Sequence, residues 1–362
     1  MKKALLTLLY FALLVLLTLA LSGCGSPTGS SSAAGLPLMD SISAGGGHTC
    51  GLDVTGGVWC WGEDMPGVTA SPARVADLSL GVRGLATGPR HNCALTVTGA
   101  LRCWGANQVG QLGNGGTTDS QVPVDASQVG GITRAVSAGL DQTCVLNAVG
   151  GVVCWGASGG PAEVSGLGSG MKAISSGWHH TCALTMAGGV KCWGSNQYGQ
   201  LGNGSTVDSQ DPVDVSGLGF GVQMISAGAG HTCAITAVGA VLCWGRNQSG
   251  ELGDGSTNDS AIPVQVSGLG AGARAVSAGG DDSAGHSCAL TVSGAVVCWG
   301  SNSAGQLGDG TTTNSAVPVQ VQGQTVGLRS VAAGGRHSCA LTATGGTVCW
   351  GQPGGAVPAE VK

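Results

Sequence analysis

The fold of this chain can be worked out from residues His231–Gly245, HTCAITAVGAVLCWG. Two cysteines ten positions apart flank a glycine turn, and the second cysteine is followed by Trp-Gly. The same phrase occurs seven times with the same spacing, so the repeat fixes the architecture before any single residue can be given a role. The cysteine pairs are Cys50 and Cys60, Cys93 and Cys103, Cys144 and Cys154, Cys182 and Cys192, Cys233 and Cys243, Cys288 and Cys298, and Cys339 and Cys349.

The spacing of each pair fits a β-hairpin. Residues that face each other across a hairpin have a constant index sum, so Cys233 and Cys243 centre the turn on Val238, within a short loop that includes Gly239. Cysteines placed directly opposite lie within reach of a disulfide bond. We therefore predict one disulfide in each repeat, with a row of reduced, buried cysteines as the alternative. A zinc site is disfavoured because the sequence contains no Cys-x-x-Cys pair.

Each repeat contains four short β-type runs separated by glycine-rich turns. In the fifth repeat they are residues 223–228, 231–236, 240–245 and 263–266. Four such runs per repeat are typical of a propeller blade. We predict an all-β fold, a seven-bladed β-propeller with four-stranded blades over residues 39–362. The tryptophan beside the second cysteine points to the opposite face of its strand, where we expect it to pack between blades.

The first residues have the pattern of an export signal. Lys2 and Lys3 precede an apolar run over residues 4–21, which ends in Leu-Ser-Gly-Cys at residues 21–24. These four residues resemble the lipobox of bacterial lipoproteins, which implies cleavage after residue 23 and acylation of Cys24. Residues 24–38 would then be a lipidated flexible tether. We expect an exported protein anchored to the outer face of a bacterial membrane, the outer membrane in a Gram-negative cell. A plain signal peptide or an uncleaved helix remains the alternative.

Cysteine usage and charge agree with export. Fifteen cysteines less Cys24 leave an even number, all of them in the seven pairs, as expected in an oxidising compartment. Without residues 1–23 the chain has 12 basic and 19 acidic residues, a net charge of −7. This balance disfavours nucleic acid and anionic lipid as partners. We expect a monomer that contacts the membrane only through its lipid anchor.

Further residues resemble a known repeat. The phrase SAGGGHTC, the CWG that ends the hairpin, a loop of the form NQxGQLGxG and a Pro-Val-x-Val run are similar to the repeat of the regulator of chromosome condensation family. The clearest loop copies are residues 107–115, 196–204, 247–255 and 302–310, and the repeats after Trp61, Trp155 and Trp350 lack the loop. The resemblance implies a seven-bladed β-propeller. As in other propellers, the last strand at residues 358–361 would close the ring by joining the blade begun by residues 41–45.

Histidine precedes the first cysteine by two positions in six repeats, and Gln142 replaces it in the third. Equivalent positions are spread around a ring, so we expect these histidines to form structural hydrogen bonds and not to converge on a metal. Asp254 and Asp309 stand where other loops have Asn114 and Asn203, each before glycine, which indicates turn chemistry. We expect no metal and no cofactor, and leave open whether a loop binds calcium.

Residues that break the repeat are the candidates for function. They include Trp59, Trp178, His179, Tyr198, Arg246 and Arg336. Aromatic and arginine side chains dominate binding interfaces, so we predict that they anchor a partner. No catalytic residues stand out. We predict a non-catalytic binding scaffold that recognises an extracellular or envelope protein or glycan through propeller-face loops, above all those after Trp-Gly. Guanine-nucleotide exchange, implied by the family resemblance, and a polysaccharide-acting enzyme are the alternatives.

Overall fold

The computed structural model describes residues 36–63, 68–323 and 327–362. The predicted signal peptide, Cys24 and nearly all of the predicted tether lie outside these residues. These described residues contain no helix that could span a lipid bilayer.

The described chain contains 28 strands in chain order. The first two blades are formed by β1 (Met39–Ala44), β2 (His48–Asp53), β3 (Val58–Gly62), β4 (Ala73–Arg74), β5 (Val82–Thr87), β6 (His91–Thr96), β7 (Leu101–Gly105) and β8 (Ser120–Asp125). The next two are formed by β9 (Thr133–Ala138), β10 (Gln142–Asn147), β11 (Val152–Gly156), β12 (Gly159–Glu163), β13 (Met171–Ser176), β14 (His180–Thr185), β15 (Val190–Gly194) and β16 (Ser209–Asp214). The last three are formed by β17 (Val222–Ala227), β18 (His231–Thr236), β19 (Val241–Gly245), β20 (Ser260–Gln265), β21 (Ala273–Gly280), β22 (Gly285–Thr291), β23 (Val296–Gly300), β24 (Ser315–Gln320), β25 (Leu328–Ala333), β26 (His337–Thr342), β27 (Thr347–Gly351) and β28 (Gly355–Glu360).

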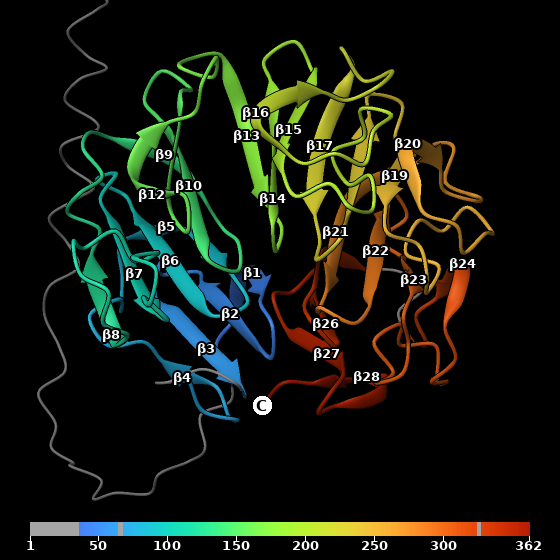
Figure 1. The fold of residues 1–362 in the computed structure, drawn as a ribbon. Coiled ribbons are helices and arrows are strands. Elements are labelled where there is room, and N and C mark those ends of the chain that lie inside the picture. The colour runs from blue at the N-terminus through green and yellow to red at the C-terminus, as the bar shows by residue number, and fades with distance from the viewer. Residues whose placement is uncertain (1–35, 64–67, 324–326) are drawn as a thin grey trace, which may run out of the picture. The chain divides into compact units, whose positions relative to one another are not determined.

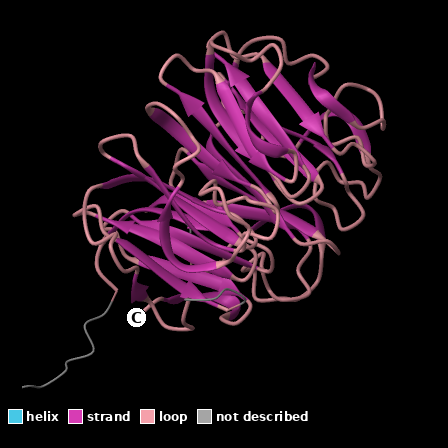
Figure 2. Cartoon of the chain, turned by 60° about the vertical axis from the view of Figure 1, so that its left-hand side comes forward, coloured by secondary structure: helices cyan, strands magenta, loops and turns pink. Residues whose placement is uncertain are grey.

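Every four consecutive strands form one antiparallel sheet, which gives seven four-stranded blades. Figure 1 shows the blades following one another in chain order around the propeller, and Figure 2 shows strands joined by loops throughout. The predicted fold is therefore confirmed. Because adjacent strands alternate in direction, the turns after the first and third strands lie on one face, here called the cavity face. Each blade's first strand begins on the other face, here called the entry face, where the cysteine hairpin also turns.

Closure of the ring differs from the expectation. Strand β28 pairs with β27 and β1 pairs with β2, so the last strand does not join the first blade. The seventh repeat supplies its own fourth strand and leaves no vacant edge for a strand from the other terminus. Packing closes the ring instead: the Met39 amide donates to the Gly345 carbonyl at 2.9 Å, and Trp61 packs with Leu341.

The predicted disulfides are present in all seven blades, in place of the alternative row of reduced cysteines. The first cysteine of each pair lies in the second strand of its blade and the second cysteine lies directly opposite in the third strand, with the two Cα atoms 4.1 Å apart. The bonds join Cys50 to Cys60, Cys93 to Cys103, Cys144 to Cys154, Cys182 to Cys192, Cys233 to Cys243, Cys288 to Cys298, and Cys339 to Cys349.

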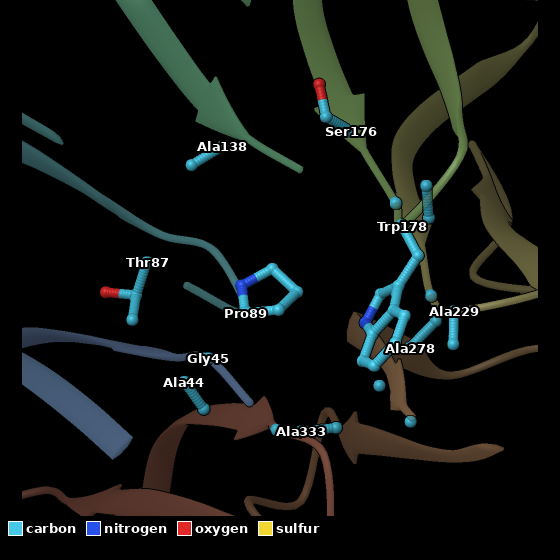
Figure 3. Close-up of a pocket in the computed structure, with 16 residues that line it drawn as sticks. Ala44, Gly45, Thr87, Pro89, Ala138, Ser176, Trp178, Ala229, Ala278 and Ala333 are labelled. Carbon is cyan, nitrogen blue, oxygen red and sulfur yellow. The ribbon is translucent and has the colours of Figure 1, made fainter. Parts of the chain in front are cut away.

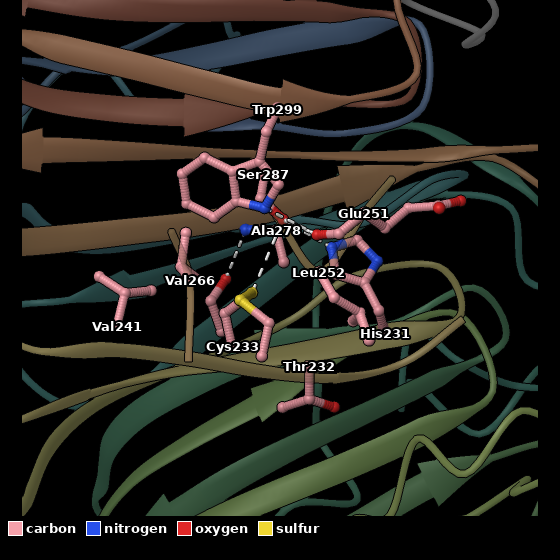
Figure 4. The surroundings of a disulfide bond; sticks show 12 residues. His231, Thr232, Cys233, Val241, Glu251, Leu252, Val266, Ala278, Ser287 and Trp299 are labelled. Carbon is pink, nitrogen blue, oxygen red and sulfur yellow. Dashed lines mark hydrogen bonds between the residues drawn. A yellow bond between two sulfur atoms is a disulfide. The ribbon is translucent and has the colours of Figure 1, made fainter. Parts of the chain in front are cut away.

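The disulfides belong to the core between the blades. Thirteen of the fourteen cysteines are buried, and Cys349, in the last blade, is partly exposed. The tryptophan of each blade packs against the disulfide of the preceding one, as Trp299 does against Cys233 (Figure 4). Each disulfide therefore packs with an indole between two blades, together with leucine, valine and alanine side chains.

The first strands of neighbouring blades contact each other around a central channel. Their glycines make this approach possible, since a Cβ atom on Gly177 would lie 2.2 Å from the Gly228 carbonyl oxygen and one on Gly45 would lie 2.3 Å from that of Gly88. A serine hydroxyl also accepts a backbone N–H of the next blade, as Ser226 does from Ala278 at 2.9 Å. The recurrent Ser-Ala-Gly run therefore holds the first strands of neighbouring blades close together around the channel.

Candidate functional site

The loops after Trp-Gly, which we expected to carry function, act in four blades as clamps to the next blade. The Gln111 carbonyl accepts both the indole N–H of Trp155 at 3.0 Å and the hydroxyl of Thr143 at 2.7 Å. Buried Asn107 holds the loop closed, because its amide donates to the Gly116 and Thr118 carbonyls. The same pattern recurs around Asn196, Asn247 and Asn302. In these blades the polar groups of the loop are therefore used within the fold, and the expected role of these loops in binding stays a prediction.

The three blades without this loop leave their junctions less complete. Among the described residues, the indole N–H groups of Trp61, Trp104 and Trp193 have no such loop carbonyl to donate to. At one of these junctions a cavity of about 180 Å³ is lined by Trp61 and Pro353. The segments that replace the loop after Trp61 and Trp350 contribute Glu63, Gln352 and Pro353 to a cavity on the same face.

The six repeated histidines form a belt of hydrogen bonds between blades, as predicted. Each Nε2 atom lies 2.7–3.0 Å from a side-chain oxygen of the following blade. The Thr232 hydroxyl already donates to the Gln200 carbonyl, so it must accept from His180. His180 is therefore the neutral tautomer with its proton on Nε2. The pairs are His48–Asn92, His91–Thr143, His180–Thr232, His231–Ser287, His286–Ser338 and His337–Thr49.

Burial keeps this belt neutral. It lowers the pKa of His180, His231 and His286 to about 3 and that of His91 and His337 to about 4. Protonation would add a charge at Nδ1, and the Nδ1 atoms of His180, His231 and His286 have no hydrogen-bond acceptor among the described residues. These histidines are structural donors, and the belt stops at Gln142, which bonds to Cys144 of its own blade.

The acidic loop positions behave as turn residues. A side-chain oxygen of Asp254 accepts the Ser256 amide at 2.8 Å, and Asn114 accepts the Gly116 amide in the same way at 3.0 Å. Within the described residues no group of three or more His, Cys, Asp or Glu side chains is placed to hold a metal ion.

The exceptions to the repeat meet on the cavity face. The guanidinium of Arg246 lies 5.4 Å from the centre of the Tyr198 ring, in the preceding blade. It also donates to the carbonyls of Asp282 and Ser283, in the insert that lengthens the turn between β21 and β22. Arg246 therefore joins three blades and holds the insert in place.

The insert continues this network to the seventh blade. Arg336 donates to Asp281 at 2.6 Å, and the Ser283 and Ala284 amides donate to the same carboxylate. Burial raises the pKa of Asp281, but the bonds from Ser283 and Arg336 outweigh it and leave the pKa below its usual value. Asp281 is therefore a fixed anion with a positioned arginine beside it.

Beneath Arg246 lies a residue that the sequence reasoning missed. Glu251 is fully buried and replaces the glutamine of the other NQxGQLGxG loops. It accepts the Ser249 amide at 2.7 Å and the Gly285 amide at 3.2 Å, and burial raises its pKa. The Gln-to-Glu exchange within the loop was the available signal.

Trp178 stands at the centre of the same face. Its indole and the ring of Pro89 lie opposite each other within a ring of small residues from the first strands (Figure 3). Above them is a cavity of about 520 Å³, whose lining includes Trp178, Arg90, Arg336, Asp281 and Glu63. Trp178 forms the floor of a polar, charged funnel at the mouth of the channel.

The structure thus gathers most of the predicted anchors. Trp178 and Arg336 line the cavity, exposed His179 stacks edge-on beside Trp178 at 6.4 Å, and Tyr198 with Arg246 supports its wall. Trp59 is not with them. It lies half-buried in β3, where its indole N–H donates to Asp53 at 2.9 Å and Arg74 stacks on its ring.

Comparisons with known proteins agree with this architecture. A model of the regulator of chromosome condensation (RCC1) repeat matches residues 98–146, 187–235, 238–290 and 293–341, together more than half of the chain. A second model of this repeat matches residues 40–64, 82–111, 171–200 and 222–251.

Among curated proteins, the chain is 37% identical over 156 residues to the ultraviolet-B receptor UVR8 of Arabidopsis thaliana. The match covers 42% of this chain and 35% of the receptor. It is 35% identical over 161 residues to the E3 ubiquitin-protein ligase HERC2 of Homo sapiens, covering 42% of this chain and 3% of the ligase. The chain therefore spans about a third or less of the length of these relatives.

Two solved structures share the fold over most of both chains. Human WBSCR16 superposes with a TM-score of 0.72 at 22% identity, over 84% of this chain and 87% of the other. Prp20p of Saccharomyces cerevisiae, described with its binding to Gsp1p and histones, superposes with a TM-score of 0.74 at 22% identity, over 86% and 87%. The chain belongs to the regulator of chromosome condensation (RCC1) repeat family.

Proposed function

We propose that this protein is a non-catalytic binding scaffold that recognises an extracellular or envelope protein or glycan at the mouth of its channel. The observation that carries the proposal is the convergence of its irregular residues on one cavity. Trp178, Arg90, Arg336 and Asp281 come from four different blades and all line it. The turn itself does not require such side chains, since its equivalents are Gly46-Gly47 in the first blade and Ala229-Gly230 in the fifth.

The chemistry of the cavity suits binding. An indole supplies a flat apolar surface, and the arginines and carboxylates around it supply directional hydrogen bonds. Asp281 is held ionised by hydrogen bonds from Ser283 and Arg336, which makes it an acceptor for hydroxyl or amide donors and a poor proton donor. Sugars and polypeptides both present this combination of apolar faces and polar edges.

We further propose that the protein is exported and anchored through Cys24 to the outer face of a bacterial envelope. The support is the Leu-Ser-Gly-Cys sequence after an apolar run, together with seven disulfides, which persist in oxidising compartments. A Cys24→Ala variant should be released from membranes after processing. Retention of the processed variant would contradict the anchor.

The second candidate is an exchange-factor-like role, favoured by the likeness of the fold to Prp20p. The two are separated by capture experiments with residues 35–362 as bait. Recovery of an envelope or extracellular protein or glycan, lost in a Trp178→Ala variant, supports the scaffold. Recovery of small GTPases alone, equally well by both baits, would replace it with the exchange-factor role.

A further inference from the structure

The entry face has a ring of positive charge that the net charge of the chain conceals. In every blade the register of the first two strands shifts around the second residue of the first strand, which is an unpaired bulge. A bulge redirects its side chain away from the ladder. Five of the seven bulge residues are basic; the set is Asp40, Arg83, Arg134, Lys172, Gln223, Arg274 and Arg329.

These basic side chains are held at the rim of the channel. Arg83 donates to the Thr133 carbonyl of the next blade at 2.8 Å, and Arg134 donates to the Ala148 carbonyl at 3.2 Å. Carbonyl acceptors position a guanidinium without neutralising it. Of the five, only Arg329 has a carboxylate partner in the described chain, Asp40 at 3.8 Å.

Apolar side chains surround this rim. The tips of the cysteine hairpins and the segments between blades lie side by side on the entry face, as the bond from the Val97 amide to the Gly81 carbonyl shows. Nine large apolar side chains at these positions are 61–83% exposed. They are Val54, Leu80, Val97, Ile132, Val149, Met186, Phe220, Val238 and Val292.

The polypeptide also enters the propeller on this face. Strand β1 begins here at Met39, after the exposed side chain of Leu38. The preceding sequence contains the apolar run of residues 4–21 and Cys24. A membrane anchor at Cys24 would therefore be connected to the propeller at its entry face.

We propose that the entry face binds the surface of an anionic lipid bilayer, with the apolar tips in the interfacial layer and the basic ring over the headgroups. Exposed apolar groups and basic residues are the two features that interfacial binding combines. Nucleic acid would engage the basic ring but leave the apolar tips in water. The exposed carboxylates Asp125 and Asp214, at the entry ends of their strands, are paired with Arg102 and Lys191. The acidic loop residues Asp254, Asp282 and Asp309 lie on the opposite face, so that face would point away from the lipid with its cavity open.

The test uses residues 35–362 without acylation. This segment is a compact unit and contains every described strand and disulfide, so it holds everything that its fold needs. Its binding is measured by co-sedimentation with vesicles of phosphatidylethanolamine and phosphatidylglycerol, and with vesicles of phosphatidylcholine alone. We expect binding to the anionic vesicles that weakens with added salt.

Single variants then separate charge from packing. Lys172→Gln should weaken anionic-vesicle binding about fivefold, and glutamine already occupies this bulge in blade five as Gln223. Phe220→Ala should weaken it without changing charge. Arg90→Gln removes a charge from the opposite face and should leave vesicle binding unaltered.

Three outcomes would overturn the inference: no binding to anionic vesicles at low salt, equal losses for Lys172→Gln and Arg90→Gln, or tighter binding to a short DNA duplex than to vesicles. Thermal unfolding of each variant identifies any loss caused by misfolding. The inference goes beyond the proposed function, since vesicle binding that survives in Trp178→Ala would stand even if no partner for the cavity were found.

Discussion

Acidification should unfold this propeller through its histidine belt. Burial lowers the pKa of His231 in the folded chain to about 3, and that of His91 to about 4, from an ordinary value of 6.5. The unfolded state therefore binds protons more readily than the folded state. The stabilisation that neutral histidine gives is complete above the unfolded pKa and is lost as the pH falls from there towards the folded pKa.

The loss of stability is large because five histidines contribute to it. At about pH 5 each such histidine costs about 2 kcal/mol of the free energy of unfolding, and the five with lowered pKa values cost about 10 kcal/mol together. Domains have about 5–15 kcal/mol in total. The chain should therefore lose most of its stability between about pH 7 and about pH 5.

Urea unfolding monitored by tryptophan fluorescence across this pH range measures the slope. His231→Gln, which copies the natural Gln142, should reduce the slope by about one proton, or about 1.4 kcal/mol per pH unit. Gln248→Ala, an exposed change in the same blade, is the control and should keep the slope of the unaltered chain. A free energy of unfolding that stays constant down to about pH 5 would show that the histidine belt does not control the stability of the propeller.

Three further changes test the packing. Replacing Cys233 and Cys243 together by alanine should cost about 2–3 kcal/mol in urea unfolding, since the short closed loop gains entropy in the unfolded chain; no loss would contradict a stabilising disulfide. Trp244→Ala should cost about 3–5 kcal/mol, because the indole fills the space between two blades; a loss below that of the disulfide would contradict its place in the core. Gly177→Ala should lower the melting temperature or prevent folding, since its Cβ would lie 2.2 Å from the Gly228 oxygen; a chain of unchanged melting temperature would show that the inner ring is not closely packed.

The fold was predictable because each blade repeats the same local information. The Cys-to-Cys spacing defines the hairpin, and the tryptophan beside the second cysteine can only point to the other face of its strand. The closure of the ring was mispredicted because it depends on which blade the last strand pairs with. Pairing of β28 with β27 follows from the seventh repeat having all four runs, which analogy with other propellers obscured.

The site was only partly predictable. Trp178, Tyr198, Arg246 and Arg336 were identified because they break the pattern, but sequence could not show that Arg246 reaches across to the insert. Trp59 breaks the pattern too, yet its indole N–H donates a hydrogen bond to Asp53 in its own blade. A residue that breaks the repeat can either stabilise its own blade or line a cavity. Only the folded structure shows which of the two it does.

We propose that the scaffold holds its partner in the cavity above Trp178. The most direct measurement compares capture from envelope and extracellular extracts by residues 35–362, by a Trp178→Ala, Arg90→Ala variant, and by Phe220→Ala as a control on the opposite face. We expect a partner that the unaltered propeller and Phe220→Ala capture but the cavity variant does not, with all three proteins melting cooperatively. Equal capture of that partner by the cavity variant would contradict it.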